Sequence, residues 1–212
     1  AMKVGQLLSM DSGQLLPPQL SGLLARLRED AHAMPLGQVA AVLKDAWGEG
    51  WESHFSRFAF TPLAAASIGQ VHEAVLKDGR RLAIKVQYPG IRASIDSDVD
   101  NVATLLRFSN LLPEGLEIES LLAEAKAQLH AEADYECEAI ALKEFAGHLA
   151  DDRRFAVPEV VDALTTERVL CMQFLDGQPV ESLAEAPSAE RNAAAVTLVE
   201  LALREVFEWG LV

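Results

Sequence analysis

Cysteine is scarce in this chain of 212 residues, which contains only Cys137 and Cys171. Two cysteines so far apart match neither a zinc-ligand spacing nor a disulfide framework. We therefore expect buried structural thiols, a reducing compartment and hence a cytoplasmic location. The chain also lacks a run of 18 apolar residues, and its first residues lack the apolar stretch of a signal peptide. Neither a transmembrane helix nor a signal peptide is expected.

Basic residues are outnumbered in this sequence. Eighteen Lys and Arg stand against 32 Asp and Glu, which gives a formal net charge of −14 and a sequence pI near 4.7. A nucleic-acid backbone needs a basic surface, so we expect no nucleic acid as the main partner. A local basic pocket for one nucleotide is still compatible with this charge. Half of the residues are hydrophobic, which predicts a globular protein of one or two domains.

The hydrophobic pattern predicts an α+β fold, in which helices come first, then strands, helices, strands and a final helix. Helices are expected within residues 3–58, at 91–110, at 116–149 as one long helix or two in sequence, and at 188–209. Strands are expected at 58–63, 69–76, 81–87, 158–161 and 169–174. Asp78-Gly79 is typical of a tight hairpin turn between two of these strands.

Alanine takes the place of glycine in the most informative motif. Residues 64–71 have the pattern A-x-A-x-x-G-x-V, and residues 83–85 are A-I-K. This is the layout of a protein-kinase nucleotide loop and lysine strand, except that the first two glycines are alanines. Glycine lets backbone N–H groups close over phosphates, and a Cβ atom changes how closely the loop can approach. We therefore expect nucleotide binding of the kinase kind, with a handling of ATP unlike that of ordinary kinases.

Lys85 lies where a kinase strand carries its phosphate-binding lysine. A surface lysine on a strand edge is the alternative, but the small-residue loop upstream favours the functional interpretation. The carboxylate partner should lie on the long helix, where the spacing puts Asp134 and Glu138 on one face. A solvated helix face is the alternative there, and periodicity does not choose among the candidates. The acidic residues in this stretch are Glu132, Asp134, Glu136 and Glu138.

Four blocks occur in a specific order along the chain. They are K-V-G-Q at 3–6, A-A-A-S-I-G-Q-V-H at 64–72, A-I-K-V-Q-Y-P-G at 83–90 and E-A-D-Y-x-x-E-A at 132–139. Together they resemble the signatures of the UbiB/AarF family of atypical kinases, also called the ABC1 or ADCK family. The resemblance implies an atypical kinase or ATPase with ATP or ADP and Mg²⁺ as cofactors. It also implies a supporting role in the biosynthesis of ubiquinone and other isoprenoid quinones.

The resemblance implies roles for individual residues. Lys85 would bind the phosphates and Glu138 would be its ion-pair partner. The family's own addition, in which the K-x-G-Q helices cover the cleft, would include Lys3, Gln6, Glu132 and Asp134. The nucleotide would be lined by Ala64, Ala65, Ala66, Ser67, Val71, Ala83 and Lys85, and by the hinge residues Met172, Gln173, Phe174 and Leu175.

The resemblance also implies how the chain is organised. Residues 1–57 would be an N-terminal helical extension. Residues 58–175 would be a kinase-like N-lobe, with a five-stranded antiparallel sheet, a long helix and a helical insertion. Residues 176–212 would leave the hinge and begin a C-lobe. The implied partners are the nucleotide and a membrane surface or quinone-biosynthesis proteins, with a peripheral location at the inner membrane.

The family's H-x-D-P-H-x-G-N catalytic loop and D-F-G-like metal site do not occur in these 212 residues. We therefore expect the Mg²⁺ ligands to lie beyond Val212, and little or no phosphoryl transfer by this chain alone. Gln173 also departs from the glutamate that the family often has after the hinge methionine. The alternative function is a non-enzymatic nucleotide-sensing or interaction module. A purely structural helical domain is disfavoured by the four ordered blocks.

Overall fold

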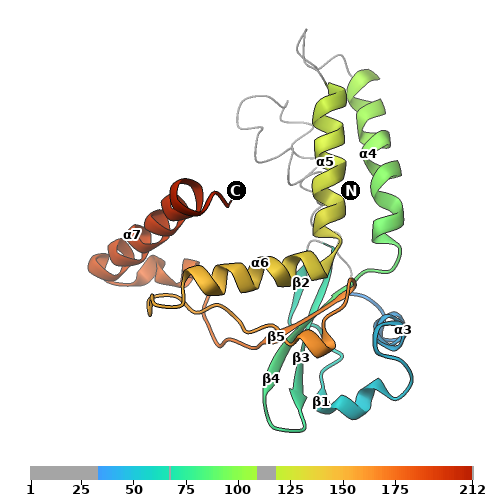
Figure 1. The fold of residues 1–212 in the computed structure, drawn as a ribbon, viewed down its shortest axis with the longest axis horizontal. Helices are drawn as coiled ribbons and strands as arrows, with labels where there is room; N and C mark the ends of the chain where they lie inside the picture. The colour runs from blue at the N-terminus through green and yellow to red at the C-terminus, as the bar shows by residue number, and fades with distance from the viewer. Residues whose placement is uncertain (1–32, 67, 109–117, 212) are drawn as a thin grey trace. The chain divides into compact units, whose positions relative to one another are not determined.

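The computed structural model describes residues 33–66, 68–108 and 118–211 (Figure 1). The chain divides into two compact units. Among the described residues, the first contains those up to His148 together with Val157–Phe174, and the second contains Leu149–Ala156 together with those from Leu175 onward. The chain therefore leaves the first unit after His148, returns to it at Val157 and leaves it again after Phe174.

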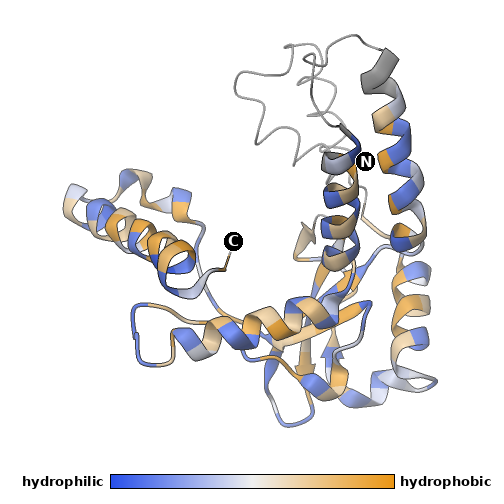
Figure 2. Cartoon of the chain, turned by 45° about the horizontal axis from the view of Figure 1, so that its top comes forward, coloured by the Kyte–Doolittle hydropathy of each residue, from blue (hydrophilic) through white to orange (hydrophobic). Residues whose placement is uncertain are grey.

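The first unit contains a sheet with helices on both of its faces. Its helices are α3 (Leu36–Trp47), α4 (Ile91–Phe108), α5 (Ile118–Glu132) and α6 (Tyr135–His148), with short 3₁₀ turns at Trp51–His54 and Asp162–Leu164. Its strands are β1 (Phe55–Phe58), β2 (Ala64–Ala66), β3 (Gly69–Leu76), β4 (Arg81–Gln87) and β5 (Val169–Gln173). The strands are coloured mainly as hydrophobic in Figure 2, as expected for a sheet covered on both faces.

The five strands form one antiparallel sheet in the order β1-β3-β4-β5, with β2 also paired to β3. The expected α+β class and five-stranded antiparallel sheet are confirmed. β3 and β4 have the bounds that the sequence predicted, and the turn between them contains Gly79 at φ 90°.

Two of the expected strands are wrong. The expected strand 58–63 does not form, because β1 ends at Phe58 and β2 begins only at Ala64. Pro62 lies in between and has no N–H group to donate to a ladder. Residues 158–161 make only an isolated bridge between Val160 and Met172. That segment turns into a 3₁₀ helix at Asp162, so it is too short for a strand.

Residues 116–149 were expected as one long helix or two in sequence, and the structure has two, with a tertiary hydrogen bond at the break. Gln87 on β4 donates its Nε2–H to the carbonyl of Ala133 at 2.8 Å, just after α5 ends. Asp134 then caps α6, since its Oδ1 accepts the backbone N–H of Glu136 at 3.0 Å. Asp134 therefore lies just before α6, and its side chain caps the start of the helix that carries Glu138.

The two faces of the sheet carry different cores. Residues paired across antiparallel strands point to the same face, so the register sorts the side chains. On one face, Ile84 and the strand residues paired with it pack against α3, which buries Val39, Val42 and Leu43 at helical spacing. On the other face, Leu170 packs with buried residues of α4, α5 and α6. Lys85 and Ala83 point to this second face.

A chain of buried polar groups crosses the first core. Gln70 accepts the backbone N–H of Met34 at 2.7 Å and donates its Nε2–H to Nε2 of His72 at 2.8 Å. His72 in turn donates its Nδ1–H to the carbonyl of Ala59 at 2.8 Å. The carbonyl of Ala59 can only accept, so Nδ1 carries a proton. The Nε2–H of Gln70 donates to Nε2 of His72, so Nε2 carries none, and the imidazole is neutral. Burial lowers the pKa of His72, and the bond to Ala59 opposes that shift.

Acid should therefore weaken the fold through His72. An unfolded histidine takes up its proton near pH 6.5, whereas the folded one does so only at lower pH. The stabilisation is complete above pH 6.5 and is lost as the pH falls below it, with a slope of up to about 1.4 kcal/mol per pH unit. Urea unfolding between pH 7.5 and 5.5 should show this slope, and His72→Gln should reduce it. Equal slopes for the two proteins would contradict the assignment.

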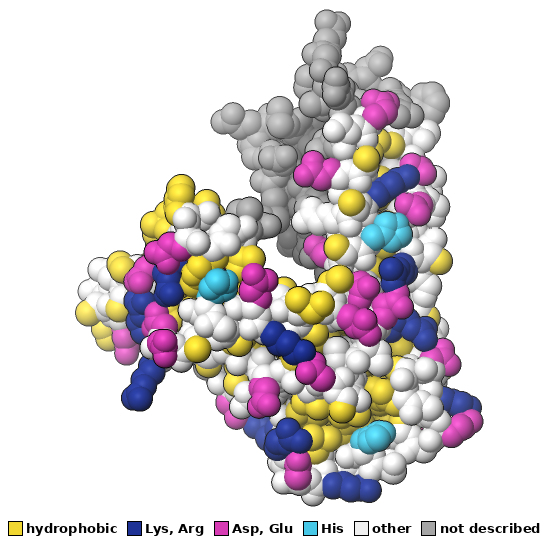
Figure 3. Space-filling view, in the orientation of Figure 1, with side chains coloured by type: hydrophobic (Ala, Val, Ile, Leu, Met, Phe, Trp, Pro, Cys, Tyr) yellow, Lys and Arg dark blue, Asp and Glu magenta, His cyan; other side chains and the backbone are white. Residues whose placement is uncertain are grey.

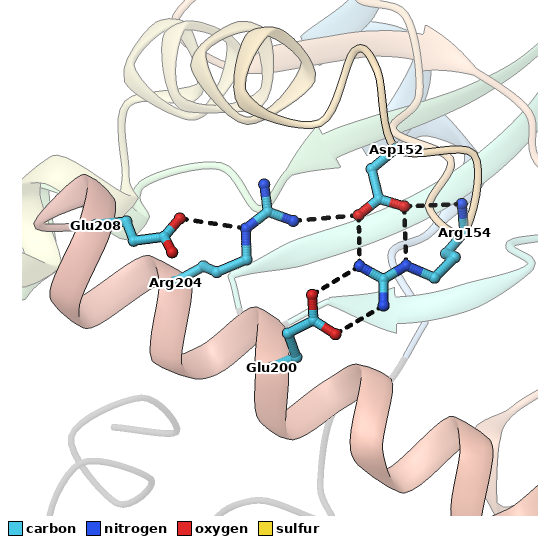
Figure 4. A network of polar contacts seen from close by, with 5 residues as sticks. All are labelled: Asp152, Arg154, Glu200, Arg204 and Glu208. Carbon is cyan, nitrogen blue, oxygen red and sulfur yellow. Dashed lines mark hydrogen bonds and ion pairs between the residues drawn. The ribbon is translucent and has the colours of Figure 1, made fainter.

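The second unit is built around α7 (Ser188–Arg204), which follows a 3₁₀ helix (Val180–Glu185) and continues into a π-helical turn (Glu205–Trp209). An ionic network joins α7 to the segment Leu149–Ala156 (Figure 4). Arg154 binds Glu200 bidentately at 2.7 and 2.8 Å and binds Asp152 through Nε and Nη2 at 2.9 and 2.7 Å. Arg154 holds the pKa of Asp152 well below its usual range.

Arg204 extends this network along α7. It donates to Asp152 at 3.2 Å and lies 3.5 Å from Glu208, one turn further along the chain. Asp152 thus accepts from two guanidinium groups at once. Networks of this kind hold two segments in register more effectively than isolated surface pairs do.

Candidate nucleotide-binding site

Four of the expected nucleotide residues share one face of the sheet. The register pairs Val71 with Lys85, and Ala83 with Met172. Directly paired residues point the same way, and Lys85 and Ala83 are two positions apart on β4, so all four side chains line the face towards α6. None of the four is fully buried. This face therefore offers small and apolar side chains with one lysine beside them.

Lys85 is paired with Glu138. Its Nζ donates to both carboxylate oxygens, at 2.8 Å to Oε1 and 2.7 Å to Oε2. The side chains are 17% and 37% exposed, so water still reaches the pair. A partly exposed pair of this kind adds little stability, typically about 0–1 kcal/mol. Its main effect is geometric: Lys85 is held over the sheet face with donor capacity left for a ligand.

Tyr135 also contacts Lys85, and the sequence reasoning assigned it no role. The ammonium lies 4.8 Å from the centroid of its ring, within the range of a cation–π contact. Burial raises the pKa of Tyr135 strongly, and the charge of Glu138 adds to the effect. Tyr135 belongs to the E-A-D-Y block, so the sequence did mark it as part of a motif. Its contact with Lys85 could not be predicted, because residues 50 positions apart in the chain leave no local pattern.

The alanine loop is a hairpin between β2 and β3. Ala64 pairs with Val71, Ala65 with Gln70 and Ala66 with Gly69. Ala64 and Ala65 are exposed and Ala66 is half-buried. Ala64 and Ala66 point to the face of Lys85, whereas Ala65 points to the opposite face. The expected Ser67 lies outside the described residues.

Gly69 is the one glycine of the kinase pattern that this loop keeps, and the structure gives the reason. A Cβ atom there would stand 2.2 Å from the backbone carbonyl oxygen of Val86 and 2.9 Å from the hydroxyl of Tyr135. Both distances are too short for any side chain. Ala64 is exposed and Ala66 is half-buried, so the structure accommodates a Cβ atom at both positions.

The expected hinge begins within β5, which contains Met172 and Gln173, and continues to Leu175. The N–H groups of Gln173 and Phe174 already donate within the fold, to the carbonyls of Glu159 at 2.7 Å and Arg81 at 3.0 Å. These two groups are therefore not available to adenine. Met172 belongs to the first unit, while Leu175 belongs to the second.

The remaining expected residues are Glu132, Asp134, Lys3 and Gln6. Glu132 ends α5, and Asp134 caps α6. Lys3 and Gln6 are outside the described residues. Within the described ranges, no three His, Cys, Asp or Glu side chains come together as a metal site.

Charge and hydropathy add two observations. On the face shown in Figure 3, acidic and basic side chains are interspersed, so the described part of that face carries no continuous basic surface. None of the helices in the described ranges combines the length and apolar character needed to cross a membrane.

The chain has an antiparallel five-stranded sheet, and a lysine on one strand is paired with a glutamate on the adjacent helix. These two features define the class of kinase-like N-lobes. Residues 26–212 match the family model of the ABC1 atypical kinase-like domain. The chain belongs to this family, which confirms the resemblance seen in the sequence.

Relatives and a solved structure agree with the family. The chain is 43% identical over 209 residues to the atypical kinase coq-8, mitochondrial, of Caenorhabditis elegans, covering 99% of the chain and 28% of that protein. It is 40% identical over 206 residues to the atypical kinase COQ8, mitochondrial, of Saccharomyces cerevisiae, covering 97% and 41%. The solved erythromycin complex of Rv3197 from Mycobacterium tuberculosis is similar with a TM-score of 0.70 at 30% identity, covering 95% and 51%.

The chain thus spans well under half the length of the two kinases that it matches. Each of those kinases therefore contains a larger part that these 212 residues do not match.

Proposed function

We propose that this chain is the nucleotide-binding portion of a UbiB-type atypical kinase or ATPase, with ATP or ADP held on the α6 face of the sheet. The observation that carries the proposal is the Lys85–Glu138 pair beside Val71, Ala83 and Met172. Lys85 would orient the phosphates, and the small side chains would leave room for the flat base. The hairpin of Ala64–Ala66 would cover the phosphates.

The relatives support a role in coenzyme Q biosynthesis, through their names as COQ8 kinases. The same names describe mitochondrial proteins. For this chain, we propose a cytoplasmic protein that is peripheral at the inner membrane, with quinone-biosynthesis proteins as partners. This part of the proposal rests on the family alone.

Nucleotide titration tests the binding site directly. ATP and ADP, each with and without Mg²⁺, should raise the thermal stability of the 212-residue chain. A ligand at about 100 times its Kd adds roughly 2.7 kcal/mol to the free energy of unfolding. A folded sample that shows no shift at saturating ATP and ADP would refute the proposed function.

Binding without turnover is expected of these 212 residues. They contain no H-x-D-P-H sequence, and phosphoryl transfer needs the aspartate and metal ligands of that loop. A phosphate-release assay with ATP and Mg²⁺ should therefore stay at background. Steady release that Lys85→Met abolishes would contradict this prediction.

The alanine loop should set the preference between ATP and ADP. Ala66→Gly removes the Cβ next to the hairpin turn, on the Lys85 face, and lets the loop approach the phosphates more closely. One added backbone hydrogen bond is worth about 0.5–1.5 kcal/mol, so the ATP-to-ADP affinity ratio should rise about two- to tenfold. Ala65→Gly is the matched control, since that side chain points to the opposite face. Calorimetry that finds the same ratio in all three proteins would contradict the prediction.

A further inference from the structure

Tyr135 begins α6 and is completely buried, at 0% exposure. Its hydroxyl has no hydrogen-bond partner among the described residues and lies against Gly69. A buried hydroxyl without a partner is unfavourable, so this group does not stabilise the fold. The ring is therefore what Tyr135 contributes at this position.

The ring and a carboxylate reach Lys85 from the same turn of α6. Tyr135 and Glu138 are three positions apart, which places them on one helix face. The Nζ of Lys85 donates to Glu138 at 2.7 and 2.8 Å and lies 4.8 Å from the ring centroid. A carboxylate alone leaves the ammonium free to move around it. A ring face on a second side removes that freedom without using any of its hydrogen-bond donors.

The same ring also touches the loop. Its hydroxyl occupies space that a Cβ atom at Gly69 would need, next to the backbone of Val86 on β4. The start of β3, the lysine strand β4 and the helix α6 therefore meet at one side chain. A shift of this ring would therefore displace both Lys85 and the end of the loop.

We propose that Tyr135 is a positioning residue, whose ring holds the Lys85 ammonium at the point from which it meets the phosphates of a bound nucleotide. This inference rests on the proposed function of the sheet face. It gives the ring a role that neither the motif nor the ion pair assigns.

Two substitutions separate the ring from the hydroxyl. Tyr135→Phe keeps the ring, and Tyr135→Met fills the space without one. Calorimetric affinities for ADP and for adenosine are compared, because adenosine has no phosphate for Lys85 to bind. Tyr135→Phe should keep the preference for ADP, and Tyr135→Met should lose about three- to thirtyfold of it. A purely structural role would weaken both ligands equally, and an unchanged preference in Tyr135→Met would overturn the proposal. A loss in Tyr135→Phe as large as in Tyr135→Met would overturn the assignment to the ring.

A double-mutant cycle tests the contact without any nucleotide. Tyr135→Met and Lys85→Met are combined, and the unfolding constants are measured in urea. The effect of the pair should differ from the product of the single effects by about threefold or more. Phe55→Met is the matched control, because it removes a ring buried in the other core, and its effect should simply multiply with that of Lys85→Met.

The outcomes of the two experiments are distinct. If the unmodified chain binds no ADP, the proposed function fails, while the cycle still decides whether Tyr135 holds Lys85. Multiplicative effects of Tyr135→Met and Lys85→Met would overturn the inference even if ADP binds. Should Tyr135→Met fail to fold, phenylalanine and its ring-fluorinated analogues at position 135 replace it. Fluorination weakens the ring face with little change in shape, so the ADP preference should fall stepwise.

Discussion

Lys85→Met is expected to lower the affinity for ADP by about 10- to 150-fold. A hydrogen bond to a charged group is worth about 1.5–3 kcal/mol, and the substitution removes the ammonium that would make it. The affinity for adenosine should stay the same, because adenosine carries no phosphate. The fold should be little affected, since Lys85 and Glu138 form a partly exposed pair and Glu138 keeps its access to water.

A lysine on α6 provides the control for this experiment. Lys143 is exposed and forms its ion pair with Asp162, whereas Lys85 is paired with Glu138. Lys143→Met changes the net charge by the same amount and should leave ADP affinity unchanged. Equal losses in the two variants would show that overall charge, and not the position of Lys85, governs binding.

Gly69→Ala is expected to have the largest effect on stability. The new methyl group would meet the Val86 carbonyl oxygen at 2.2 Å and the Tyr135 hydroxyl at 2.9 Å. The carbonyl belongs to the central strand β4, which is paired on both sides and cannot move aside. Overpacking of this kind costs about 1–3 kcal/mol, and a backbone contact puts the expected loss at the upper end. Urea unfolding measures it.

Gly147→Ala is the matched control. Gly147 lies in α6, and a Cβ there would meet no atom within 4 Å. Alanine should stabilise that helix by about 0.5–1 kcal/mol. A Gly69→Ala chain as stable as the unmodified one would mean that β4 and Tyr135 yield easily. Steric exclusion by β4 and Tyr135 would then not be the reason for a glycine at position 69.

The part of the fold that could be predicted is the part with local signals. Leu82, Ile84 and Val86 alternate with residues of the other face along β4, and Asp78-Gly79 marks the turn between β3 and β4, so both strands were predicted to the residue. The break between α5 and α6 has a weaker signal, the capping Asp134 within a stretch that is otherwise rich in Ala and Glu. Gln87 also bonds to Ala133 at the break, from a strand 46 positions away. Sequence periodicity carries no information about hydrogen bonds between residues so far apart in the chain.

The site divides in the same way. Lys85 could be inferred from the spacing of the loop and the strand. Glu138 could be chosen only through the family resemblance, since the helix offered four acidic residues. Tyr135 was not predicted as a contact of Lys85, because a ring under an ammonium group depends on how α6 crosses the sheet. Local pattern thus identified the strand residues, and tertiary packing determines their partners.

The path of the chain between the two units limits how the protein can be dissected. The segment Leu149–Ala156 belongs with α7, although the residues on either side of it belong to the sheet unit. A shortened version that ends near residue 175 would keep this segment but lose Glu200 and Arg204. Arg154 would then lose one of its two carboxylate partners, and Asp152 would lose one of its two guanidinium partners. Ending the chain near residue 175 is therefore not enough to prepare the sheet unit alone. Leu149–Ala156 should also be replaced by a short linker.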